Sequence, residues 1–249
     1  MTWMLQDEAA NPYLDVCQHA AKSNEFFKRF KSHPAYTHVL EHVSYEEGKE
    51  YLKEIDIDYL DKLQEIKQND TMGKPNTHEY PSIGEISPTT IRYIKNTSDI
   101  VNKFGTSFDS IVEIGGGYGG LCVTASNYIN FDSYLILDQE EPNQLTTKYV
   151  SNWDLPHQSC RLDELRLEDG HKFDLCISNY AFSECNRETQ TEYLYRIVGR
   201  ARNLYFVYNT FTENIQLQEF LDRVSDRYDV ECEDDHEGAS PQVIYAKEK

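Results

Sequence analysis

A glycine-rich run is the strongest chemical signal in the sequence. Residues 112–120 read Val-Glu-Ile-Gly-Gly-Gly-Tyr-Gly-Gly, and they follow an apolar stretch and precede a helical pattern. Consecutive glycines let a backbone turn sharply and approach a ligand where a Cβ atom would clash. The N-terminus of the following helix offers free N–H donors. The next apolar stretch ends in Asp138, about 20 residues further on, where a carboxylate can accept hydrogen bonds from ribose hydroxyls.

Two cofactor classes fit this combination. Gly115-x-Gly117-x-x-Gly120 satisfies the dinucleotide pattern, whereas Glu113-x-Gly115-x-Gly117-x-Gly119 satisfies the first motif of class I S-adenosylmethionine-dependent methyltransferases. A carboxylate beside the loop would repel a pyrophosphate, but it would attract the cationic amino and sulfonium groups of S-adenosylmethionine. The chain carries 24 Lys and Arg against 43 Asp and Glu, a net charge of −19. Glu113 and this charge favour a methyltransferase over a nicotinamide enzyme. A glycine turn that binds no ligand is the least favoured interpretation.

The elements around the run alternate between strand and helix. Short apolar stretches separated by helical patterns predict parallel strands joined by crossover helices, that is, a Rossmann-like α/β sheet covered on both faces. Only residues 233–241 separate the last two strands, too few for a crossover helix, so we expect an antiparallel C-terminal hairpin. The predicted strands are residues 110–114, 133–138, 158–161, 173–179, 203–209, 228–232 and 242–246, and the helices between them are residues 118–129, 142–153, 187–202 and 213–225.

The first part of the chain shows helical patterns only. Asn11-Pro12 can cap one helix, Ser44-x-x-Glu47 forms a capping box, and Ser87-Pro88 opens a helix that stops at Gly105. A loop rich in turn-forming residues, 69–84, lies between the last two. We therefore expect a helical region over residues 1–86, serving as a lid, a dimer contact or a substrate-binding cap. The methyltransferase domain would comprise residues 87–249.

Four segments resemble a family of sugar O-methyltransferases found in bacterial and large-virus glycan gene sets. They are residues 87–93 (Ser-Pro-Thr-Thr-Ile-Arg-Tyr), the glycine run with Ile111, residues 135–138, and residues 178–184 (Ser-Asn-Tyr-Ala-Phe-Ser-Glu). The sequence is also similar to the methyltransferase domain of chlorovirus glycan-building proteins. The resemblance implies a seven-stranded Rossmann-like fold, S-adenosylmethionine as donor and a sugar hydroxyl as acceptor, for example on a deoxyhexose such as rhamnose or fucose. Gln139-Glu140 departs from the Leu-Pro of the family.

These considerations assign binding roles along the carboxyl edge of the sheet, where α/β folds hold ligands. Asp163, in the loop after the third strand, would accept from the adenine amino group, although a solvated turn is an equally good interpretation. Arg92, Tyr118, Tyr180 and Asn209 are predicted to contact the sugar. The predicted cofactor contacts are Glu113, Gly115, Gly116, Gly117, Tyr118, Asp138, Gln139, Asp163 and Asn179.

A sugar hydroxyl is a weak nucleophile, so a group must take its proton. His236 in the C-terminal hairpin loop is the first candidate for this base, followed by Glu184 and Tyr180. A divalent metal held by Asn179, Asn209 and the acids at 234–235 is a less favoured route. His38 and His42, four residues apart on a predicted helix, are interpreted as a solvated face.

Composition limits the partners. The acidic balance argues against nucleic acid and anionic membrane surfaces, and no apolar run approaches the ~20 residues that span a bilayer. The six cysteines form no C-x-x-C pair, which indicates reduced thiols. Asp7 and Glu8 near the start predict that there is no signal peptide, so we expect a cytoplasmic protein (host cytoplasm for a viral one). The first helices are a candidate contact for a homodimer. Other small-molecule O- or N-methylation, or a fold that has lost catalysis, are the alternatives.

Overall fold

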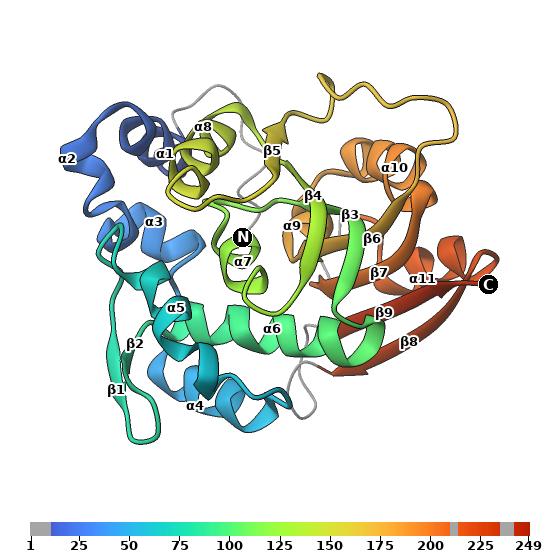
Figure 1. Ribbon diagram of the computed structural model, residues 1–249. Coiled ribbons are helices and arrows are strands. Elements are labelled where there is room, and N and C mark those ends of the chain that lie inside the picture. Colours follow the sequence, from blue (N-terminus) through green and yellow to red (C-terminus); the bar gives the residue numbers. More distant parts are fainter. Residues whose placement is uncertain (1–10, 210–213, 235–241) are drawn as a thin grey trace.

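The computed structural model describes residues 11–209, 214–234 and 242–249, and its centre is a seven-stranded sheet (Figure 1). The strand order is β5-β4-β3-β6-β7-β9-β8. The first five strands in this order, β5-β4-β3-β6-β7, run parallel, and β9 pairs antiparallel with both β7 and β8. The predicted α/β sheet and its C-terminal hairpin are therefore confirmed. The strands are β3 Ser107–Ile114, β4 Asn130–Leu137, β5 His157–Cys160, β6 Phe173–Asn179, β7 Ala201–Tyr208, β8 Tyr228–Asp234 and β9 Gln242–Glu248.

Helices cover both faces of this sheet because alternate strand residues point to opposite sides. On β3, Ile111 joins the core beneath α6, α7 and α8, whereas Val112 and Ile114 join the core beneath α9, α10 and α11. The helices over the two faces are α6 Pro88–Phe104, α7 Gly120–Ala125, α8 Glu140–Val150, α9 Ala181–Glu184, α10 Arg187–Arg196 and α11 Leu217–Ser225. Helices α7, α8 and α10 end earlier than the predicted 118–129, 142–153 and 187–202, because turns follow α7 and α8 and a 3₁₀ turn follows α10.

The first 86 residues are not helical throughout, which corrects the sequence-based expectation. Strands β1 (His78–Tyr80) and β2 (Gly84–Ile86) form an antiparallel hairpin whose Tyr80 and Ile86 are buried. The hairpin forms because Pro81 and Gly84, the latter at φ +73°, turn the chain back on itself. The other elements are α1 Pro12–Lys22, α2 Asn24–Phe27, α3 Pro34–Val39, α4 Tyr45–Glu54 and α5 Leu63–Lys67, with 3₁₀ turns at Phe30–Ser32, Leu60–Lys62 and Gln68–Asp70, and later at Val198–Arg200.

Local signals at the starts of these helices are mostly confirmed. The Asn11 side chain accepts from the Tyr13 amide, and Ser44 and Glu47 form the reciprocal capping box. Ser87 differs, because its hydroxyl faces Glu41 and makes no capping bond to α6. Pro88 nevertheless begins that helix and Gly105 ends it.

The N-terminal helices share a hydrophobic core with the sheet. In Figure 1, α1 lies beside α8. Phe30 and Tyr36 pack in one cluster with Tyr118 and Tyr149. Lys31 is fully buried among these rings. Its Nζ donates to the Asn69 carbonyl at 2.6 Å and lies 4.1 Å from the centroid of Tyr118. The two predicted units, 1–86 and 87–249, are thus joined by continuous packing in the described part of the chain.

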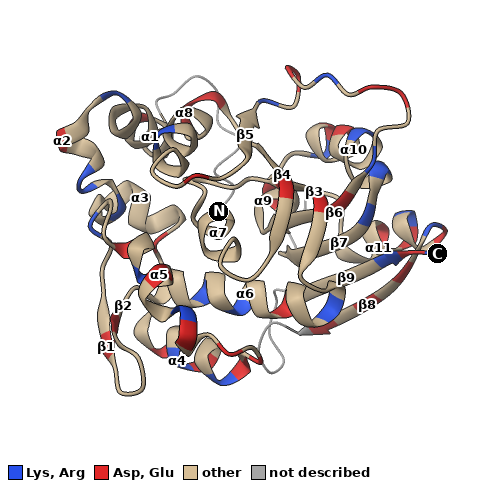
Figure 2. Ribbon diagram, in the orientation of Figure 1, with Lys and Arg blue, Asp and Glu red and all other residues tan. Residues whose placement is uncertain are grey.

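Residues of both charge signs occur along the same helices, for example on α4 and α10 (Figure 2). Lys49 pairs with Glu46 on the first of these helices, and Arg196 pairs with Glu192 on the second. Such exposed pairs each contribute little to stability, about 0–1 kcal/mol. Within the described residues, no helix has the length and apolar character needed to cross a membrane.

Candidate functional site

The glycine loop begins where β3 ends, and two of its glycines are required by close contacts. Gly115 has φ +75°, and a Cβ atom there would lie 2.0 Å from the Cβ of Ala181 on α9. Gly117 has φ +58°, and its Cβ would lie 2.6 Å from a methyl group of Leu40. The loop is therefore enclosed on one side by α9 and on the other by the N-terminal region.

Two adjoining hollows of about 330 Å³ and 270 Å³ lie beside this loop, at the carboxyl edge of the parallel strands. They share Gly115, Asp138, Gln139 and Ala181, so they form one elongated site. Asp163 lines only the smaller hollow. The other predicted residues that line the larger hollow are Arg92, Glu113, Gly116, Gly117, Asn179, Tyr180, Glu184 and Asn209.

Asp138 occupies the junction of the two hollows. Its carboxylate accepts from the amide of Gly117 at 3.0 Å and from the amide of Gln139 at 2.8 Å. Burial raises the pKa of Asp138 to about 6, although both backbone hydrogen bonds act in the opposite direction. A carboxylate has about four acceptor positions, so this one retains capacity for the hydroxyls of a bound ligand.

Glu113 is the second buried acid of the site, with 2% of its surface exposed. Its Oε2 accepts from the Tyr134 hydroxyl at 2.9 Å, and no ion pair to it occurs among the described residues. Burial raises the pKa of Glu113 to about 7. A cationic ligand in the larger hollow would therefore stabilise the ionised form of this carboxyl.

The end of β6 carries a strained residue. Tyr180 has φ +68° and ψ −38°, one of two non-glycine residues at positive φ in the described chain. Such conformations cost of order 1–3 kcal/mol and cluster at functional sites. The amide of Tyr180 donates to the Val207 carbonyl at 2.8 Å, which holds the turn. The preceding Asn179 accepts from the Asn96 side chain at 3.2 Å and faces the hollow.

Arg92 is a buried cation with an incomplete set of partners. It is 6% exposed, and its Nη2 donates to the Leu40 carbonyl at 3.3 Å. Its Nε is buried without a hydrogen-bond partner, and the guanidinium carbon lies 5.7 Å from the Tyr180 ring centroid. An unsatisfied buried donor is costly. Arg92 is therefore suited to an anionic group of a ligand in the larger hollow.

Glu184 and Asn209 complete the edge next to Tyr180. Their side chains hydrogen-bond to each other, and burial raises the pKa of Glu184 above its ordinary value. The first residue of β9, Gln242, pairs with Tyr208 at the end of β7. Strand β9 therefore begins at this same edge, and His236 lies outside the described residues.

Two predicted side chains are placed differently from expectation. Tyr118 is fully buried, and its ring lies 4.7 Å from that of Tyr149. The predicted contact of this side chain with cofactor or sugar is therefore wrong, because the aromatic core behind the loop holds it. Asp163 reaches the rim of the smaller hollow, but its carboxylate pairs with Arg161 at 2.5 Å.

The sequence analysis missed the wall supplied by the N-terminal region. Val39, Leu40, His42 and Glu47 also line the larger hollow. His42 lies beyond α3, which ends at Val39, so its predicted place on a helix face is wrong, although the residue is exposed as expected. Glu47 was identified only as a helix cap. No motif in the sequence marks these residues.

In the part of the chain that the structure describes, no group of three or more His, Cys, Asp or Glu side chains could hold a metal ion. The amide side chains Asn179 and Asn209 face the same hollow but are weak ligands alone. Asp235, one of the acids named for the metal-dependent route, lies outside the described residues, so that route stays the less favoured expectation.

Comparisons with known proteins concern the fold. No protein-family model and no curated protein matches the chain. The N-methyltransferase NodS from Bradyrhizobium japonicum WM9, in complex with S-adenosyl-L-homocysteine, is similar in structure with a TM-score of 0.50 and 11% identity, over 81% of this chain and 97% of that one. TrmK from M. capricolum, also in complex with S-adenosyl-homocysteine, gives 0.44 and 14%, over 61% and 66% of the chains.

The similarity to NodS and the strand order agree. Together they show that this protein has the fold of the class I S-adenosylmethionine-dependent methyltransferases. At this level of identity the likeness establishes the architecture alone, so the chemistry of the site must be argued from the residues present.

Proposed function

We propose that this protein is an S-adenosylmethionine-dependent methyltransferase that transfers a methyl group to a sugar hydroxyl. The observation that carries the proposal is the elongated site over the glycine loop, with Asp138 at its junction. Asp138 would hold the ribose, and the smaller hollow would take the adenine. The larger hollow would then receive the amino-acid end of the cofactor together with the acceptor.

The charges of the larger hollow support this cofactor. S-adenosylmethionine has one carboxylate and two cationic groups. Arg92, with its unpartnered Nε, would bind the carboxylate, and Glu113 would face the cations. When bound, the cofactor supplies an electrophilic methyl group. The protein then has to hold the acceptor oxygen in line with it and remove a proton.

The acceptor is proposed from the sequence resemblance and from polar side chains at the strand ends. Asn179 and Asn209 can each hydrogen-bond to sugar hydroxyls without requiring charge on the acceptor. The alternative is methylation of another small-molecule oxygen or nitrogen, since NodS is an N-methyltransferase. Cytoplasmic location and a homodimer through the N-terminal helices remain predictions.

Calorimetry with S-adenosyl-L-homocysteine and with 5′-methylthioadenosine, which lacks the amino-acid carboxylate, tests the cofactor. We expect Arg92→Gln to lower the affinity for S-adenosyl-L-homocysteine by about tenfold or more, because a charge-assisted hydrogen bond to the carboxylate is lost. The affinity for 5′-methylthioadenosine should be unchanged. Arg223→Gln, on the outer surface of α11, is the matched control. Absence of binding to the wild-type chain at millimolar ligand would reject the proposal.

The acceptor is tested with methyl-labelled S-adenosylmethionine. Methyl rhamnosides and methyl fucosides are offered beside phenols and primary amines, and the products are identified by mass spectrometry. Transfer to a glycoside hydroxyl supports the sugar assignment. Transfer to phenols or amines alone would favour the alternative, and cofactor binding with no transfer to any acceptor would indicate a fold that has lost catalysis.

A further inference from the structure

His42 belongs to the N-terminal region but faces the proposed site of methyl transfer. It lines the larger hollow together with Arg92, Asn179 and Glu184. The segment that carries it is fixed at both ends, because Leu40 packs against Gly117 and Ser44 caps α4. The imidazole is therefore presented to the hollow by a short, anchored connection between α3 and α4.

One hydrogen bond determines which ring nitrogen of His42 is available. Nδ1 lies 3.0 Å from the Val39 carbonyl oxygen, which can only accept, so Nδ1 carries the hydrogen. In the neutral ring the lone pair is then on Nε2. An imidazole in this tautomer, oriented by a backbone carbonyl, has the arrangement of a general base.

The surroundings of His42 lower its pKa, although part of the residue is exposed. Partial loss of hydration beside the hollow is the largest cause, and the positive charge of Arg92 on α6 acts in the same direction. His38 on α3 also lowers it, whereas Glu47 on α4 and the hydrogen bond to Val39 raise it. The net shift is downward, which favours the form that can accept a proton.

We propose that His42 is the general base of the reaction and accepts the acceptor proton at Nε2; this inference rests on the proposed methyl transfer. The proton of the acceptor hydroxyl passes to Nε2, and the ring becomes an imidazolium. The oxygen forms its new bond to the methyl carbon as the carbon–sulfur bond breaks, with that electron pair remaining on the sulfur of the thioether. Release of the proton to water then restores the neutral ring.

The other described candidates are less suited to this role. Glu184 is occupied by its hydrogen bond to Asn209. Tyr180 has a phenol whose ordinary pKa is about 10, and its ring lies against the guanidinium of Arg92. His42 alone among these three has a neutral nitrogen base whose orientation is fixed by a hydrogen bond at the other ring nitrogen.

The first test needs no acceptor. Nitrogen-15 NMR of the full-length protein with bound S-adenosyl-L-homocysteine should show His42, assigned by its loss in His42→Gln, as the Nδ1–H tautomer. Its pKa should lie below the ordinary value of about 6.5. An Nε2–H tautomer, or a pKa above about 7, would overturn the proposal whatever the acceptor is.

The second test uses the methyl glycoside that the wild-type protein methylates. His42→Gln should lower kcat by about 100-fold, with KM and the affinity for S-adenosyl-L-homocysteine nearly unchanged. His78→Gln, exposed on β1 and outside the lining of the hollow, is the matched control. In His42→Ala, added imidazole should restore part of the rate in proportion to its free-base fraction.

The outcomes separate the two proposals. A wild-type protein that binds no cofactor, or binds it and methylates no glycoside, rejects the proposed function and the role of His42 with it. If the wild-type protein methylates a glycoside, and His42→Gln does so at the same rate and with the same pH dependence, only the role of His42 as the base is rejected. Loss of cofactor affinity in His42→Gln would show a structural role and also reject it.

Discussion

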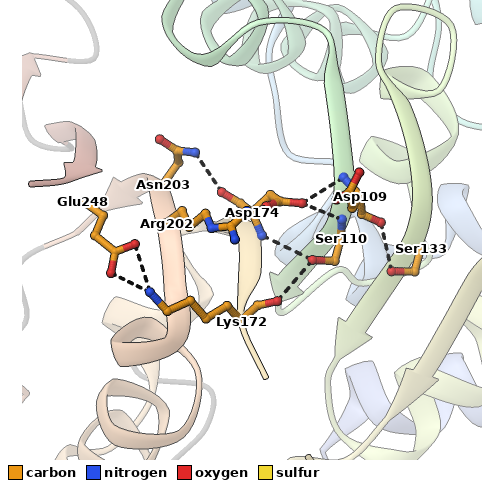
Figure 3. A network of polar contacts seen from close by, with 8 residues as sticks. All are labelled: Asp109, Ser110, Ser133, Lys172, Asp174, Arg202, Asn203 and Glu248. Atoms are coloured by element: carbon orange, nitrogen blue, oxygen red, sulfur yellow. Dashed lines mark hydrogen bonds and ion pairs between the residues drawn. The ribbon is translucent and has the colours of Figure 1, made fainter. Parts of the chain in front are cut away.

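The two ends of the central sheet use the same kinds of residue in opposite ways. At the amino edge, the Asp174 carboxylate accepts from the amides of Asp109 and Ser110 and pairs with Arg202, and Lys172 pairs with Glu248 (Figure 3). At the carboxyl edge, Glu113 and Asp138 are buried with raised pKa values, and Arg92 has an unpartnered Nε.

This difference distinguishes an end that holds the fold together from an end that is prepared for a ligand. Satisfied polar groups contribute to stability, whereas unsatisfied buried groups reduce it until something binds. Matched substitutions at the two edges should therefore have opposite effects on stability and on binding.

The largest contrast is expected between Asp138→Asn and Asp174→Asn. Asp138→Asn should weaken the binding of S-adenosyl-L-homocysteine by two to three powers of ten, about 3–4 kcal/mol. The single acceptor oxygen of an asparagine side chain cannot accept from both backbone amides and from the ribose hydroxyls as well. Asp174→Asn should leave binding unchanged and lower the free energy of unfolding by about 1–3 kcal/mol. Calorimetry and urea denaturation measure the two effects.

Each of these variants is the control for the other. Equal losses of ligand affinity would show that the two edges do not differ in function. Equal losses of unfolding free energy would show that Asp138 contributes as much to the stability of the fold as Asp174.

A second contrast concerns pH. Glu113 has a pKa of about 7 in the folded chain and would have about 4.3 when unfolded, so between these values the folded state binds more protons. Its contribution to stability is therefore lost as the pH rises through about 7. Glu113→Gln should exceed the wild type by about 2–3 kcal/mol in unfolding free energy near pH 8, with the difference vanishing near pH 4.

The comparison is made by urea denaturation over this pH range. Glu65→Gln, on the exposed side of α5, should show no such pH-dependent gain. A Glu113→Gln variant that is no more stable than the wild type at high pH would mean that Glu113 has a cationic partner in solution.

The smallest expected effect comes from backbone strain. Alanine at position 180 would keep the positive φ, whereas glycine adopts it freely. Tyr180→Gly should therefore be more stable than Tyr180→Ala by about 1 kcal/mol. Tyr195, exposed on α10, is the control position. There the glycine variant should be less stable than the alanine variant by about 1 kcal/mol, because glycine disfavours a helix. The same order at both positions would argue against strain at Tyr180.

The sequence predicts the sheet well because its signals are local. Alternation of apolar strands and helical patterns, the short stretch 235–241 between β8 and β9, and the glycine run followed by Asp138 are all patterns of residues near one another in the sequence. These features predict the parallel sheet with its C-terminal hairpin, and they place Glu113, Asn179 and Asn209 at one edge.

What the sequence could not provide depends on contacts between distant segments. Tyr118 follows the glycine loop and looks like a ligand contact, but Lys31 and Tyr149, far away in sequence, draw its ring into the core. His42 enters the site because Leu40 packs on Gly117, which no spacing in the chain foretells. The strain at Tyr180 likewise arises from the turn between β6 and α9.

The buried ammonium of Lys31 limits how far this protein can be shortened. Deleting everything before Pro88 would spare every strand of the large sheet, yet it would open a tyrosine-lined hole behind the glycine loop and remove the methyl groups that press on Gly117. Truncated versions that begin at α6 should consequently be poor starting points for crystallography or engineering. The smallest stable unit of this fold should therefore be larger than the sheet and its crossover helices.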